Sequence, residues 1–199
     1  MRIGFIGPAE GDVEALREAL DFLLGDAGAD SVIYMGEDDT ADQLAEEARR
    51  AATGGADGTF LGAALVLAMS GTPEQISALL GAEEDLEKLS ALRILPPSPM
   101  RAVEMLDDRI VLLVHDKAVL AEDDIVNASV IVFGRSKELM LKRFGARYFF
   151  TPGPLNQGQV GLLEREGDGR LAAAAFDLSG RPLWREVLQW RTAKIMVAT

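Results

Sequence analysis

The sequence predicts an α/β fold built around a parallel sheet. Within the first fifty residues, apolar runs at 1–6 and 31–35 alternate with helix-like stretches at 13–25 and 40–50. A strand–helix–strand–helix order of this kind forms a parallel sheet with right-handed crossovers. The length of 199 residues and the hydrophobic content of 48% are sufficient for one domain, 1–199, with a sizeable core.

Local signals indicate where these elements begin and end. We expect Asp12 to cap the first helix and Thr40 the second, because such side chains accept hydrogen bonds from the first turn. The middle of the chain is harder to assign. The stretch 60–69 is compatible with a strand or a helix, two helical pieces are predicted between 72 and 89, and a short strand over 92–95.

The second half of the chain predicts more strands, which end at turns. Apolar runs at 109–115 and 128–133 predict two buried strands joined by a short helix, and 147–150 predicts a third. From residue 160 onward, turn signals separate segments that predict a closing antiparallel meander. The final stretch, 181–199, is then an edge element or a contact for a partner.

Composition excludes several classes of protein. The chain has no cysteine, which excludes disulfides and thiolate metal sites, and only one histidine, His115. The opening MRIGFIG is typical of a buried strand rather than a signal peptide. The longest apolar run, at about 63–69, is too short to span a bilayer. We therefore expect a cytoplasmic protein with no membrane span.

The negative charge is concentrated in one half of the chain. The net charge is −12, and residues 1–100 hold 6 basic and 19 acidic residues whereas residues 101–199 hold 14 and 13. Nucleic acid needs a basic face, so we expect no nucleic-acid partner. The acidic half is typical of a solvated surface, and it is also compatible with a surface that a basic partner contacts.

Five segments, each at the end of an apolar strand, carry a family signal: MRIGFIGPAEGDVEALREAL, SVIYMGEDD, RIVLLVHD, ASVIVFGRSK and YFFTPGPLNQGQVGLLE. In this order they resemble the metal-binding loops of calcineurin-like metallophosphoesterases, over roughly residues 1–50 and 105–180. The resemblance implies a four-layer α/β/β/α sandwich. It also implies a site at the strand ends, where that family holds two cations that activate water against a phosphate ester.

The same resemblance implies that most of the metal ligands are lost. Gly7 and Ala9 stand where the family has an aspartate and a histidine, and neither has a side-chain donor. Glu37 replaces the bridging aspartate. Residues 93–99 lack the asparagine and histidine expected there.

The last two motifs of the resemblance carry positive charges. His115 is retained, but Asp116 replaces the glycine after it, and Arg135 and Lys137 replace the final two histidines. At about 4 Å each basic group would oppose a unit charge on a metal by roughly 4 kcal/mol. We therefore expect no metal, no cofactor and no hydrolase activity. The leading hypothesis is a pseudoenzyme that binds a protein partner as a scaffold or regulator, and a retromer subunit that resembles this fold is a precedent in kind.

Alternatives remain open for this remnant pocket. Arg135 and Lys137 are suited to holding a small anion such as phosphate or a nucleotide. We favour the alternative in which they neutralise Glu37, Asp38 or Asp116 within the protein and fill the cavity. A rebuilt weak phosphoesterase on Glu37 and His115 is a third reading, although His115 is more typical of a hydrogen-bonded loop residue.

Two further clusters have both a functional and a structural interpretation. The acids Glu37, Asp38 and Asp39, with Asp42 nearby, match the ligands of Mg²⁺, but helix capping explains them as well.

The C-terminal stretch supplies the candidates for a partner contact: Trp184, Arg185, Trp190 and Arg191. If it is instead an edge strand or a packed helix, the tryptophans belong to the core, as we expect for one of them. The sequence fixes no oligomeric state, and a dimer is compatible with it.

Overall fold

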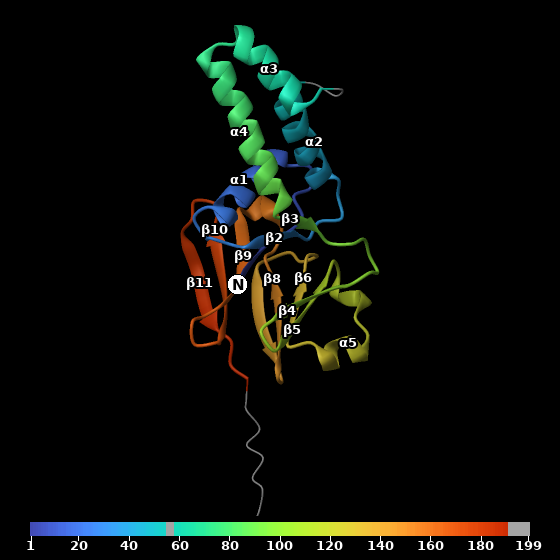
Figure 1. The fold of residues 1–199 in the computed structure, drawn as a ribbon. Helices are drawn as coiled ribbons and strands as arrows, with labels where there is room; N and C mark the ends of the chain where they lie inside the picture. The colour runs from blue at the N-terminus through green and yellow to red at the C-terminus, as the bar shows by residue number, and fades with distance from the viewer. Residues whose placement is uncertain (55–57, 191–199) are drawn as a thin grey trace, which may run out of the picture.

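A computed structural model describes residues 1–54 and 58–190. Figure 1 shows two sheets with helices outside them. One sheet has six strands in the order β11-β10-β9-β1-β2-β3, and the other has five in the order β4-β5-β6-β8-β7. Helix α1 (Val13–Leu24) packs on the outer face of the first sheet, and α5 (Glu122–Asn127) on that of the second. The predicted α/β/β/α layering is confirmed.

The first sheet combines a parallel half with an antiparallel half. Strand β1 pairs in parallel with β2 and antiparallel with β9. The predicted closing meander is confirmed, and its last strand, β11, is an edge strand. The six strands are β1 (Arg2–Ile6), β2 (Ser31–Tyr34), β3 (Leu92–Ile94), β9 (Gln159–Arg165), β10 (Leu171–Asp177) and β11 (Pro182–Val187).

The second sheet contains two strands that the sequence did not predict. They are β4 and β7, which lie at the two edges and pair antiparallel with β5 and β8. Both are short, and charged residues interrupt their apolar runs: Glu104 in β4, and Lys142 and Arg143 in β7. The five strands are β4 (Ala102–Leu106), β5 (Arg109–Val114), β6 (Val130–Phe133), β7 (Met140–Phe144) and β8 (Arg147–Thr151).

The two N-terminal helices begin in different ways. Asp12 caps α1 as predicted, accepting a hydrogen bond from the backbone N–H of Ala15 at 3.0 Å. The cap predicted for α2 (Thr40–Thr53) is wrong. Asp39 occupies the capping position, and Thr40 is the first helical residue. The hydroxyl of Thr40 instead donates to Asp38 and accepts from the N–H of Gly11.

The middle of the chain forms a helical hairpin. It consists of α3 (Phe60–Ser70) and α4 (Pro73–Ser90), which with α2 extend away from the sheets (Figure 1). Helix α4 is continuous, where the sequence predicted two pieces. It begins with a capping box in which Thr72 and Gln75 exchange hydrogen bonds. Among the helices described by the structure, none combines the length and apolar character that crossing a membrane requires.

The main core lies between the two sheets. Alternate residues of the facing strands fill it, and the rings of Phe5 and Phe150 meet edge to face with centroids 6.0 Å apart. Because the core holds the two sheets together, it also fixes how the loops after their strands meet.

Candidate functional site

The loops that follow β1, β2, β5, β6 and β8, here called the strand tips (7–11, 35–39, 115–117, 134–138 and 152–154), touch through backbone atoms. A Cβ atom added to Gly7 would lie 1.7 Å from the carbonyl oxygen of Gly153. A Cβ added to Gly134 would lie 2.2 Å from the carbonyl oxygen of Met35. Since any side chain at these two positions would overlap backbone, both must be glycine in this arrangement.

His115 joins the strand tips from inside. Its side chain is only 3% exposed, with Nδ1 3.1 Å from the carbonyl oxygen of Met35 and Nε2 2.9 Å from that of Pro96. Carbonyl oxygens only accept hydrogen bonds, and a neutral imidazole carries a single N–H. Only one of these two contacts is therefore a hydrogen bond of the neutral ring, and both ring nitrogens point at backbone oxygens rather than at a position for a metal.

Arg135 and Asp116 form an ion pair at the surface. The backbone N–H of Arg135 donates to the carbonyl of His115 at 2.7 Å, and its Nη1 donates to Asp116 at 3.2 Å. The Arg135 side chain is 79% exposed, so the pair lies over the strand tips rather than inside them. Lys137 is exposed, and its ammonium forms no ion pair with the residues that the structure describes.

The acidic residues of the β2 loop do not converge on one point. Glu37 is exposed, and its carboxylate accepts a hydrogen bond from the N–H of Ser98 at 3.2 Å. Across 1–54 and 58–190, no three acidic, histidine or cysteine side chains come together in a way that could hold a metal ion. The structure therefore links His115, Asp116 and Arg135 by hydrogen bonds, and among the described residues it shows no hydrogen bond or ion pair from the side chains of Glu37 and Lys137 to these three.

The sequence did not point to Tyr34 and Asp38 as a centre of the site. The buried Tyr34 hydroxyl donates to Asp38 at 2.6 Å and accepts from the N–H of Ala9 at 3.0 Å. Asp38 also accepts from the N–H groups of Thr40 and Glu10. The network ties the β1 and β2 loops together. A tyrosine that ends an apolar strand needs a partner for its hydroxyl, and that need was the available signal.

These hydrogen bonds fix the protonation of both groups. Burial raises the pKa of Tyr34, and its hydrogen bond to Asp38 raises it further. For Asp38, burial alone would raise the pKa, but the hydrogen bonds donated by Thr40 and Tyr34 outweigh it and lower the pKa. At neutral pH the Asp38 carboxylate is charged and the Tyr34 phenol is neutral, so the phenol can donate its proton in the hydrogen bond to the carboxylate.

The predicted partner contact at the C-terminus is largely occupied by the fold itself. Trp184 packs edge-on against Phe150, and Trp190 against Tyr148, with centroids 5.9 and 5.6 Å apart. Both tryptophans are partly buried on the core between the sheets. Arg185 is exposed but bonded to the two carboxylates of Glu164 and Glu166, and Arg191 lies outside the described residues.

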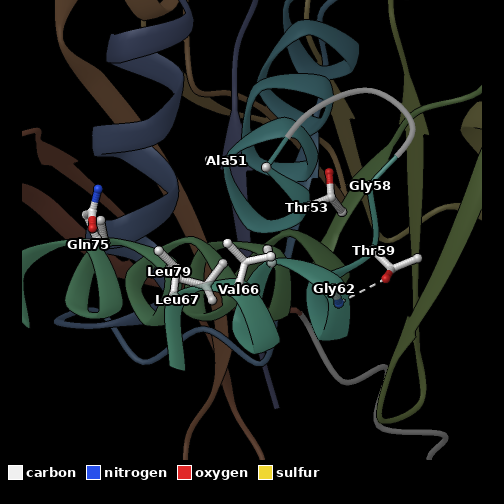
Figure 2. Close-up of a pocket in the computed structure, with 12 residues that line it drawn as sticks. Ala51, Thr53, Gly58, Thr59, Gly62, Val66, Leu67, Gln75 and Leu79 are labelled. Carbon is white, nitrogen blue, oxygen red and sulfur yellow. Dashed lines mark hydrogen bonds between the residues drawn. The ribbon is translucent and has the colours of Figure 1, made fainter. Parts of the chain in front are cut away.

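Helix α3 presents a surface that the sequence analysis missed. None of its residues is buried, and Leu61 and Met69 are 77% and 82% exposed. A groove of about 580 Å³ separates α3 from α2 and α4, and Figure 2 shows Val66, Leu67 and Leu79 along it. The available signal was the all-apolar stretch itself, because a helix that is hydrophobic on every side must be covered by something.

Comparison with known proteins shows likeness in structure but not in sequence. The chain matches no protein-family model and no curated protein. Among solved structures it is similar to a predicted phosphoesterase from Streptococcus pneumoniae, at 12% identity and a TM-score of 0.56, covering 94% of this chain and 97% of that one.

Two further structures are similar over nearly the whole chain. The phosphoesterase Yfce from Escherichia coli matches at 13% identity and a TM-score of 0.54. A single-residue variant of Vps29 from Entamoeba histolytica matches at 15% and 0.50. Each comparison covers 95% of this chain and all of the other. Identities this low establish the fold and leave the chemistry to the residues present.

The residues at the strand tips do not fit the two-metal centre that this fold implies. Gly7 and Ala9 carry no donors, and backbone carbonyls occupy both nitrogens of His115. The chain has the metallophosphoesterase fold, with strand tips that are packed against one another.

Proposed function

We propose that this protein binds another protein as a scaffold or regulator and does not hydrolyse phosphoesters. The close backbone contacts at Gly7 and Gly134 are the observation that supports the absence of hydrolysis. A dinuclear centre needs ligands from several strand tips and a cavity for the ions and the substrate. Backbone packing at both glycines supports the absence of such a cavity.

Helix α3 supports the binding role. Six large apolar side chains on α3 and the adjoining part of α4 are exposed: Leu61, Leu65, Val66, Met69, Ile76 and Leu80. Exposed apolar side chains that are concentrated in one segment often mark a protein–protein interaction site. Helices that dock into a partner's groove present apolar anchors at this spacing.

The charges around α3 define the chemistry of the partner. The chain has no lysine or arginine between Arg50 and Lys88, and α4 carries Glu74, Glu83 and Glu84. Helices that lie on anionic membranes have basic polar faces, which this hairpin lacks. The partner that fits is a protein with an apolar groove and a basic rim, because its charges complement the acids that flank α3.

The binding role is tested with a variant of α3 and a matched control. The variant carries Leu61→Ser, Leu65→Ser and Met69→Ser, and the control carries Val103→Ser and Met105→Ser, two exposed apolar residues of β4. A protein captured from the native cytoplasm is purified and its affinity for each chain is measured. We expect wild type and control to bind equally, and the α3 variant at least about tenfold more weakly, since exposed anchors dominate such contacts.

Two results would contradict this role. One is equal binding of the captured protein by the α3 variant. The other is a wild-type dimer in solution that the α3 variant converts to monomer, because the surface would then be covered by a second copy.

The absence of catalysis is tested by metal analysis and by turnover of bis(p-nitrophenyl) phosphate with added Mn²⁺. We expect no bound transition metal and no turnover above buffer. Turnover that Glu37→Gln or His115→Ala abolishes would instead favour a rebuilt phosphoesterase.

A small anion above the strand tips is the second candidate, favoured by the unpaired charge of Lys137. A thermal shift with inorganic phosphate that Arg135→Ala removes would favour this sensor over the scaffold.

A further inference from the structure

The outer face of the second sheet holds a pocket that the proposed function does not use. Its volume is about 560 Å³, and β6, β7, β8 and the region around α5 line it. The core between the sheets lies on the opposite face, since Tyr148 and Phe150 point inward there. A pocket of this size is in the usual range for small organic ligands.

Aromatic rings form the floor of the pocket. They are those of Phe133, Phe144 and Phe149. The rings of Phe144 and Phe149 meet edge to face with centroids 5.4 Å apart, while Phe133 is buried and Phe144 remains half exposed. Such a surface favours a flat ring that stacks or packs edge-on.

Three cations surround this floor. Lys117 Nζ lies 5.2 Å from the centre of the Phe133 ring, and Lys142 Nζ lies 5.1 Å from that of Phe144. Arg147 is the third. None of the three forms an ion pair within the described part of the chain, and the residues that line the pocket include no carboxylate. Unpaired cations gathered in one place are unexpected in a protein with a net charge of −12.

Arg147 is not fully satisfied by the protein. One Nη2 hydrogen donates to the carbonyl of Val126 at 2.9 Å. Its Nε is buried and has no hydrogen-bond partner among the described residues. A buried donor without an acceptor is costly. An anionic oxygen that reaches the guanidinium from the pocket would gain a charge-assisted hydrogen bond.

We propose that this pocket binds a small ligand that joins an aromatic ring to an anionic group such as a phosphate, sulfonate or carboxylate. The ring lies on the phenylalanines, and the anion lies among Lys117, Lys142 and Arg147. Of the residues that line this site, only Lys117 belongs to a strand tip and none lies on α3. Its test is therefore independent of the scaffold proposal.

The test uses two fluorescent probes with the same rings. The first, 1-anilinonaphthalene-8-sulfonate, is anionic, and the second, N-phenyl-1-naphthylamine, is its uncharged parent. We expect the anionic probe to bind wild type more tightly than the parent. The variant Lys117→Glu with Lys142→Glu should weaken the anionic probe by about tenfold or more, because two charge-assisted contacts become repulsive, and should leave the parent nearly unchanged.

Matched variants distinguish the contribution of the lysine charges, the contribution of the Phe144 ring, and dye binding elsewhere on the protein. Arg143→Glu makes the same charge reversal one residue along β7 from Lys142, where the side chain stacks over Tyr148 instead, and should have little effect. Phe144→Ala should weaken both probes. Because these dyes also bind exposed apolar surface, the titrations are repeated in the α3 variant, where binding at this pocket persists. Equal affinity for the two probes, or equal loss in Arg143→Glu and the lysine variant, would overturn the proposal.

Discussion

The strand tips and the α3–α4 hairpin differ in how completely they are packed. At the strand tips, backbone meets backbone so closely that Gly7 and Gly134 admit no side chain. On the hairpin, an eleven-residue helix has no buried residue and lies beside an open groove. The strand tips are therefore the more tightly packed region, and the α3–α4 hairpin leaves apolar surface exposed.

This contrast predicts that substitutions in the two regions change the stability of the chain to different extents. Close packing around His115 and the hydrogen bonds of Tyr34 contribute stability at the strand tips. The exposed leucines and methionine of α3 contribute little to stability, because their side chains stay in contact with water in the folded chain. Three measurements of the free energy of unfolding test this difference in packing.

The largest effect is expected for Gly7→Ala. The new methyl group would overlap the carbonyl of Gly153, and relief requires the two loops to separate. We expect a loss of about 3 kcal/mol or more, measured by urea unfolding. Gly81→Ala in α4 is the control, because its Cβ would meet no atom within 4 Å. It should stabilise the chain by about 0.5–1 kcal/mol. A neutral Gly7→Ala would show that the strand tips hold free space.

An intermediate effect is expected for Asp38→Asn. The pKa of Asp38 is lowered in the folded chain by the hydrogen bonds of Thr40 and Tyr34, despite its burial. Its stabilisation is therefore fully present above the unfolded-state pKa of about 4 and is lost as the pH falls through the lower folded-state pKa.

At neutral pH we expect Asp38→Asn to cost about 1–2 kcal/mol. Below about pH 4 the difference in the free energy of unfolding between wild type and Asp38→Asn should become smaller. Chemical unfolding across this range measures it, and a gap that widens on acidification would contradict the network.

The smallest effect is expected on α3. Leu61→Ser and Met69→Ser should each change the free energy of unfolding by no more than about 0.5 kcal/mol, since both side chains are already in water. Leu79→Ala is the matched contrast, because Leu79 on α4 is only 7% exposed. This substitution should lower the free energy of unfolding by about 2 kcal/mol or more. A comparable loss for Leu61→Ser would mean that α3 is packed within the chain.

Much of the fold could be predicted from the sequence because its strands are strongly apolar. β1, β5 and β6 are buried on both faces, so their patterns are continuous. β4 and β7 were missed because edge strands such as MLKRF keep one face in water. Thr40 was misassigned because its hydroxyl serves Asp38 and Gly11, a contact between distant residues that no local pattern reveals.

The site could be predicted only in part. Sequence reasoning could note that Gly7 and Ala9 carry no side-chain donor, since this needs only residue types. It could not show that Gly7 touches Gly153, because these residues come together only when the two sheets pack. The pocket at Lys117 and Lys142 depends on three strands and a helix meeting, so it has no signature along the chain.

The charged edge of the first sheet limits how this protein can associate. β11 is an outer strand, and Arg185 there forms ion pairs with Glu164 of β9, two strands away, and with Glu166, which directly follows β9. An incoming strand from another molecule would have to bury or displace these charges, which discourages sheet-to-sheet polymerisation. Concentrated samples should consequently resist growth into cross-β fibres at this edge.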